Sequence, residues 1–251
     1  MIKIFMAWFM YMLIFASKQN NMKKAILTMI ASLALGIVFS QVVSESTARK
    51  FNIGVGVSTD IWQGLPSDMK ARTINQGAQV FGMYNHRIKE SVVYLAAGIG
   101  VSSHNLYSNN YIGDVKADSI VFTKIPDDIK YKKSKLSLTY IDVPLEFRIV
   151  TEKFFRIALG FKFGFNVDAH TKYKGNRFVA QDDDTYGTDG VNVKEKQKDV
   201  KQIETWRYGP TFRIGYKWFN VTMYYQLSSV FKVDKGPQIY PISIGIAVIP
   251  F

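Results

Sequence analysis

Two histidines stand two residues away from a side chain that could activate them. Ser102 precedes His104, and Asp168 precedes His170. A carboxylate can orient a histidine as a general base, and a nearby serine can then serve as a nucleophile. Both pairs are compatible with a hydrolase. The same spacing arises between any two polar neighbours on one strand, however, and no third partner is recognisable, so a non-enzymatic protein is favoured.

Metal and nucleotide sites have less support. The acidic loop 181–190 resembles a calcium-binding loop, but Tyr186 and Val193 stand where two of the ligands should be. No helix follows the Gly-x-Gly segments at 54–56 and 98–100, so they are not phosphate loops. The chain has no cysteine, which excludes disulfides and thiolate ligands. We therefore expect no cofactor and no metal.

A third group of residues places full charges on faces that otherwise carry small side chains. Three acids and six bases recur at alternating positions in three segments. They are Asp142, Glu146, Asp168, Arg148, Arg156, Lys162, Arg207, Arg213 and Lys217. If the segments are strands, all nine side chains face one interior, where buried charges must pair. A salt-bridged interior is favoured, and the surplus of bases leaves a bound anion or a narrow anion path as the alternative.

The segments that carry these charges have the period-two alternation of β-strands. In 155–167 every odd position is apolar, while the even positions carry glycine, alanine or polar residues. Segments 51–61, 91–105 and 205–218 alternate in the same way. A soluble barrel would keep charges out of its core. An unbroken, aromatic-rich apolar face opposite a charged one is instead typical of a barrel in lipid with a polar lumen.

Counting the alternating segments predicts about eight strands in a closed, antiparallel transmembrane β-barrel. They are expected at 50–61, 75–88, 91–107, 133–150, 154–170, 201–217, 220–232 and 239–251. Short connections at 89–90, 151–153 and 218–219 then alternate with longer ones at 62–74, 108–132, 171–200 and 233–238. Outer-membrane barrels have short periplasmic turns and long external loops, which assigns 108–132 and 171–200 to the cell exterior. An interior of this size can be filled by side chains.

The apolar positions change parity within 133–150. Leu136, Leu138 and Tyr140 are apolar at even positions, whereas Ile141 begins a run of apolar odd positions. A switch of one residue predicts a β-bulge near Tyr140–Ile141.

Two short apolar runs precede the barrel region, and neither is long enough to span a bilayer as a helix. The second follows two lysines and ends at Ser40 before Gln41, as in a signal peptide. We expect an upstream extension at 1–21, a signal peptide at 22–40 and the barrel domain at 41–251. Cleavage would lower the formal charge from +12 to +8. Export makes a nucleic-acid partner implausible.

The segment Tyr140-Ile141-Asp142-Val143-Pro144-Leu145 resembles the Y-[IL]-[DE]-[IV]-P-L stretch of the PorT-like outer-membrane β-barrel family. The leader ending in Phe-Ser-Gln, the stretch at 104–109 and the strand at 157–165 are also similar to its members. The resemblance implies an eight-stranded outer-membrane barrel. It implies no activity, because architecture rather than function unites such families.

The sequence thus predicts an integral outer-membrane protein that is not an enzyme. We expect a structural, surface-interaction or secretion-accessory component with a plugged polar lumen. A small anion-preferring channel and a lipid-modifying enzyme remain the alternatives. Expected partners are the membrane lipid, the assembly machinery through the terminal Phe251, and an unidentified protein or ligand at 108–132 and 171–200.

Overall fold

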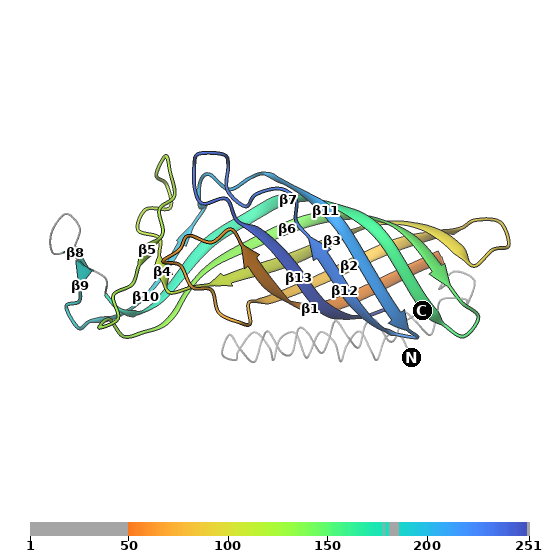
Figure 1. The fold of residues 1–251 in the computed structure, drawn as a ribbon, viewed down its shortest axis with the longest axis horizontal. Helices are drawn as coiled ribbons and strands as arrows, with labels where there is room; N and C mark the ends of the chain where they lie inside the picture. The colour runs from red at the N-terminus through yellow and green to blue at the C-terminus, as the bar shows by residue number, and fades with distance from the viewer. Residues whose placement is uncertain (1–49, 178, 181–185, 250–251) are drawn as a thin grey trace, which may run out of the picture. The chain divides into compact units, whose positions relative to one another are not determined.

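Eight long strands pair antiparallel with their neighbours and run side by side through the molecule (Figure 1). The computed structural model describes residues 50–177, 179–180 and 186–249. The long strands are β1 (Phe51–Gln63), β2 (Gln76–Arg87), β3 (Val93–Tyr107), β6 (Tyr131–Val150), β7 (Phe155–Asn176), β11 (Trp206–Tyr216), β12 (Phe219–Tyr225) and β13 (Tyr240–Val248). β1 also pairs with β13 and thereby closes the sheet. The predicted closed antiparallel barrel of eight strands is confirmed.

The connections alternate in length, as predicted. Segments 88–92, 151–154 and 217–218 form what we call the turn end of the barrel. Segments 64–75, 108–130, 177–205 and 226–239 form the long-loop end, where the short strands gather (Figure 1). These are β4 (Asn110–Tyr111), β5 (Thr123–Lys124), β8 (Val179–Ala180), β9 (Tyr186–Gly187) and β10 (Asn192–Lys198).

The β7–β11 connection differs from the prediction of a loop at 171–200. β7 continues to Asn176, and β10 pairs with its last residues, from His170 opposite Lys198 to Asn176 opposite Asn192. β11 then begins only at Trp206 and pairs with the part of β7 nearer the turn end, from Phe155 to Phe165. The extension escaped the sequence pattern because its alternating residues are lysines rather than apolar side chains.

The outer wall below this extension is a band of exposed apolar side chains. On β6 the band runs from Ile141 to Ile149, which is roughly 27 Å along a strand and roughly 20 Å of height at the usual tilt. Trp206 packs edge-on against Phe165 at its upper border, with ring centroids 5.1 Å apart. The lower border carries a second aromatic group: Phe155, Tyr216, Trp218 and Phe219. Two aromatic girdles around an apolar band are the outer surface of a membrane barrel.

A register shift in the β6–β7 ladder falls between Thr139 and Tyr140, where a bulge was expected. The extra residue is Val167 on β7, since Thr139 faces Asp168 and Tyr140 faces Asn166. The bulge occurs at the predicted level, but the extra residue lies on β7 and not on β6. Even-numbered residues of β6 remain buried from Ser134 to Arg148. The apolar positions change from odd to even there because the inward-facing side chains of β6 change from charged, as at Asp142 and Glu146, to apolar, as at Leu138.

The interior is therefore divided into two layers. The layer nearer the turn end holds the charged side chains beside a small apolar cluster of Phe81, Met83, Ala96, Ala247 and Ile249. The long-loop end is occupied mainly by one large apolar cluster, which we call the cap. Its buried members are Trp62, Met69, Leu106, Ile112, Val115, Ile120, Leu136, Leu138, Tyr140, Ala169, Val200, Ile203, Val230, Phe231 and Ile239. Most of the loops at this end contribute to it, so they fold over the barrel mouth.

The predicted upstream extension, signal peptide, cleavage site Ser40–Gln41 and terminal Phe251 lie outside the described residues. Within the described part of the chain, no helix is long and apolar enough to cross a bilayer.

Candidate functional site

Asp142 on β6 is the centre of one buried charge cluster. The Nη2 atom of Arg207 donates to both of its carboxylate oxygens, at 2.7 and 2.8 Å, and Nε lies 3.2 Å from Oδ1. Ser102 donates to Oδ2 at 2.6 Å, and the Lys162 ammonium lies 3.8 Å from it. Gly164 makes room for this cluster, because a Cβ there would lie 2.5 Å from Asp142 Oδ1 and 2.7 Å from Arg207 Nε. Three neighbouring strands thus supply one ion-pair network.

Aromatic rings complete the first cluster. The Arg207 guanidinium lies 3.8 Å from the centroid of the Tyr140 ring, and the Lys162 ammonium lies 3.8 Å from that of Tyr224. A ring face attracts a cation most strongly where water is excluded. Tyr140 also borders the cap, so it separates the charged layer from the apolar one.

Glu146, four residues further along β6 and closer to the turn end, is the centre of a second cluster. Arg148 donates through Nε to Oε2 at 2.7 Å, and Arg213 Nη2 lies 2.9 Å from Oε1. Arg148 also donates to the amide oxygens of Asn52 and Asn85. Arg148 and Glu146 are each 2% exposed as side chains, so this pair is enclosed by the protein.

Arg156 adds a third guanidinium near Glu146. It is buried, and its Nη1 atom has no hydrogen-bond partner; the same holds for Nε and Nη1 of Arg213. Across the described residues, five bases and three acids are buried. The bases are Arg148, Arg156, Lys162, Arg207 and Arg213, and the acids are Asp60, Asp142 and Glu146. The interior therefore carries a cationic surplus.

Asp60 was missing from the charges that the sequence singled out. It is fully buried on β1, where it accepts a hydrogen bond from Ser243 at 2.6 Å and lies 3.0 Å from His104 Nδ1. Its place on the polar, inward face of β1 was the available signal. His104 thus contacts Asp60 rather than Ser102, whose hydroxyl belongs to the Asp142 cluster. The Ser102–His104 pair expected for a hydrolase does not form.

Two of the nine predicted interior charges lie elsewhere. The extra residue at Val167 reverses the parity of β7, so Asp168 and His170 leave the interior and pair with each other, with 2.6 Å between Oδ2 and Nδ1. The Asp168 side chain is 43% exposed. Burial lowers the pKa of His170 from its usual value, although Asp168 opposes the shift.

Lys217 is also misplaced by the sequence pattern. It is exposed at the turn end, between β11 and β12, with a φ of 51°. The strand alternation stops one residue earlier, so extending it to Lys217 was wrong.

Three of the four loops of the cap (108–130, 177–205 and 226–239) are hydrogen-bonded to one another above the charged layer. Lys201 donates its backbone N–H to Val115 at 2.8 Å, and Ile120 donates to Lys235 at 2.9 Å. Ile203 and Phe231 form a β-bridge between the 177–205 and 226–239 loops. The mouth is therefore covered by loops that are hydrogen-bonded together rather than by one mobile strap.

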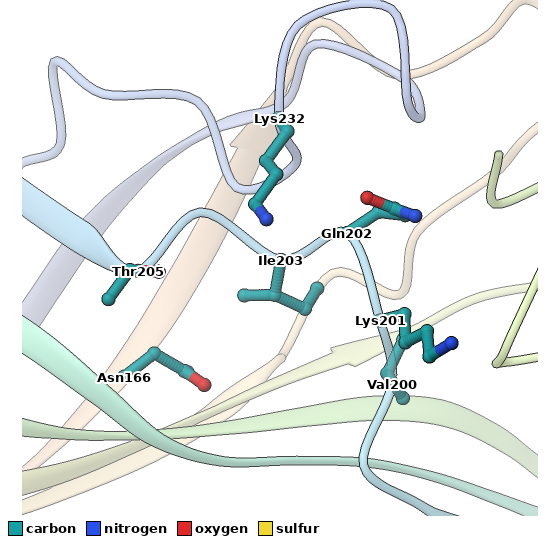
Figure 2. A pocket seen from close by; sticks show the side chains of 7 residues that line it. All are labelled: Asn166, Val200, Lys201, Gln202, Ile203, Thr205 and Lys232. Carbon is teal, nitrogen blue, oxygen red and sulfur yellow. The ribbon is translucent and has the colours of Figure 1, made fainter. Parts of the chain in front are cut away.

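Two cavities accompany these layers. One of about 50 Å³ lies in the charged layer, beside His104, Lys162 and Arg213. A larger cleft of about 340 Å³ opens where β10 and β11 leave the edge of β7 uncovered. Figure 2 shows its lining: Asn166, Val200, Lys201, Gln202, Ile203, Thr205 and Lys232. Ile203 and Val200 form its apolar floor, so the cleft ends against the cap.

Metal binding gains no support within the described residues, where no group of three or more histidine and carboxylate side chains is placed to hold an ion. The first half of the loop resembling a calcium site, 181–185, lies outside them.

A closed barrel with an apolar outer wall, aromatic girdles and a charged interior defines the class of transmembrane β-barrels. Residues 39–232 match the family described as "Outer membrane protein beta-barrel domain". The chain belongs to this family. The PorT-like subtype suggested by residues 140–145 stays a prediction.

Two solved structures are similar at low identity. One is described as "Asymmetric conductivity of engineered proteins", with 8% identity and a TM-score of 0.21, and the other is a mutant of the Rh. blastica porin, with 9% identity and a TM-score of 0.21. Each match covers 79% of this chain and 99% of the other. No curated protein matches the chain.

Proposed function

We propose that this outer-membrane barrel is a non-conducting, non-enzymatic surface component with a sealed lumen that acts through its long-loop end. The observation that carries the proposal is the double filling of the interior. Ion pairs around Asp142 and Glu146 occupy the lower layer, and the cap occupies the upper one. An ion crossing the barrel would have to break both.

The orientation follows from the connections. Short turns face the periplasm in outer-membrane barrels, so the long-loop end faces the cell exterior. A partner there would meet the folded loops of the cap, as their hydrogen bonds present a shaped surface. His104 and His170 each contact a carboxylate, and the Ser102 hydroxyl donates to Asp142 rather than to His104, which supports a binding role over hydrolysis.

Single-channel recording in planar bilayers tests the sealed lumen. The purified wild-type protein should show no steady open level, and a variant without the 64–75 and 108–130 loop residues of the cap serves as the comparison. Stable conductance from the wild type would contradict the proposal.

The anion-preferring channel remains the second candidate because the buried layer holds two more bases than acids among the described residues. If wild-type openings are found, their reversal potential in a salt gradient should show anion selectivity. Loss of that selectivity in Arg156→Gln would assign the path to this guanidinium.

A further inference from the structure

Above the apolar band, the outer face of β6, β7 and β10 is a sheet of lysines. Lys174 lies opposite Lys133 on one side and Lys194 on the other, and one pleat lower Lys172 lies between Lys135 and Lys196. Lys198 follows opposite His170. We call these seven residues the lysine array.

Like charges placed directly opposite each other destabilise a sheet. On this face of the described strands, the acidic residue is Asp168, and its carboxylate is already paired with His170. Glu195 belongs to the opposite face of β10, where it accepts a hydrogen bond from Tyr111 at 3.0 Å. The array therefore has no matching set of acids within the described strands.

Burial and the neighbouring lysines lower the pKa of the two central members of the array. Burial, Lys133 and Lys172 together lower the pKa of Lys135 to about 8. Burial also lowers the pKa of Lys172, with Lys196, Lys133 and Lys194 as further causes. Bound anions would relieve this repulsion.

Protection of an edge strand does not account for the array. Lysines often guard an exposed edge against pairing with another chain. β10 is such an edge, but Lys135, Lys172 and Lys174 lie on β6 and β7 at positions that are paired on both sides.

The position of the array relative to the bilayer indicates its ligand. Lys135 lies six residues beyond Ile141, the upper end of the apolar band on β6. This is about 20 Å along the strand and about 15 Å above the hydrocarbon at the usual tilt. A lysine side chain that snorkels downwards shortens this distance by several ångströms. The ammonium groups of the central row therefore lie roughly 10 Å above the hydrocarbon, at the outer edge of the headgroup layer on the side of the barrel.

We propose that the lysine array binds the phosphate groups of a phosphorylated glycolipid in the outer leaflet, the class to which lipid A belongs. The array stands on the lateral wall directly above lipid-facing side chains, where the adjacent molecules are lipids. A soluble acidic protein would instead be expected to meet the loops on top. The proposal uses the orientation given under Proposed function, but the binding it describes can be measured without that orientation.

Native mass spectrometry of the detergent-solubilised full chain, titrated with diphosphoryl lipid A, tests the proposal. The variant Lys135→Gln/Lys172→Gln/Lys196→Gln removes the central row. Lys89→Gln/Lys153→Gln/Lys217→Gln is the matched control, because it removes the same charge from exposed positions at the turn end.

The array variant should lose at least about tenfold in lipid A affinity, while the control keeps wild-type affinity. Dephosphorylated lipid A should bind the wild type as weakly as diphosphoryl lipid A binds the array variant. Millimolar inorganic phosphate should not compete with lipid A, because a single phosphate ion can contact only one row of the lysine array.

The array variant should keep the compact, fast-migrating form on gels, because the repulsion that its substitutions remove offsets the loss of one partly exposed hydrogen bond, from Lys135 to Asn105. Equal affinity of wild type and array variant would overturn the proposal, as would equal binding of phosphorylated and dephosphorylated lipid. Full competition by inorganic phosphate would assign the array to free phosphate, and preferential binding of an acidic peptide would assign it to a protein partner. None of these results depends on whether the lumen conducts.

Discussion

Replacing Glu146 by alanine should destabilise the barrel more than any exposed substitution. The carboxylate pairs with Arg148 at 2.7 Å and Arg213 at 2.9 Å, and Arg156 lies nearby without a full set of partners. Removing it leaves three guanidinium groups in an enclosed space. Breaking a buried pair from one side costs about 3–5 kcal/mol.

The expected shift can be measured directly. A loss of about 3–5 kcal/mol in the free energy of unfolding corresponds to a drop of roughly 10 °C in the midpoint temperature of unfolding for a domain of this size. The assay is the temperature at which the compact, fast-migrating form disappears from gels. Glu146→Gln, which keeps the shape and one acceptor, should fall between the alanine variant and the wild type.

Two further variants separate charge from packing. Lys217→Ala should leave the midpoint unchanged, because this lysine is exposed in a turn. Glu146→Ala/Arg213→Met should recover part of the loss, because it removes one of the stranded charges. A Glu146→Ala midpoint within about 2 °C of the wild type, or a double variant less stable than the single one, would refute the ion-pair reasoning.

Three other predictions concern processing, orientation and the cap. N-terminal sequencing of the membrane fraction should find Gln41 as the first residue, and an intact Met1 would contradict the signal peptide. Epitope tags near Asp118 and Asp184 should be labelled on intact cells and a tag at Lys89 should not, whereas the reverse pattern would invert the topology. Phe231→Ala empties a fully buried position in the cap, so it should cost about 3–5 kcal/mol on the same gel assay; an unchanged midpoint would show that the cap contributes no stability.

Period-two alternation was sufficient to predict the barrel, because lipid outside and charge inside enforce strict parity over the membrane-spanning segments. It was sufficient to place seven of the nine charges inside as well. Asp168 was misplaced because one extra residue, Val167, reverses every later position of β7, and a single sequence contains no mark of such an insertion.

The partners within the interior could not be predicted. Alternation fixes the face of a residue but not its height relative to residues on other strands. Asp142 meets Arg207 across 65 residues of sequence because β6, β7 and β11 have a particular register. The lysine array was overlooked for another reason. Its segments alternate charge with mixed residues, and apolar periodicity does not detect that pattern.

The change from a charged to an apolar interior at Tyr140 coincides with a change outside from apolar to basic. Above this level the barrel has an apolar interior and a basic outer face, as in a water-soluble barrel. Below it the barrel has a charged interior and an apolar outer face, as in a membrane barrel. Sliding the protein towards the periplasm would bring the lysines into hydrocarbon, at about 2–4 kcal/mol each near the midplane. Sliding it outwards would expose the apolar band to water. The inversion therefore fixes the depth of the barrel in the bilayer. In the proposed orientation, the upper section would acquire its final packing only after it has crossed the membrane.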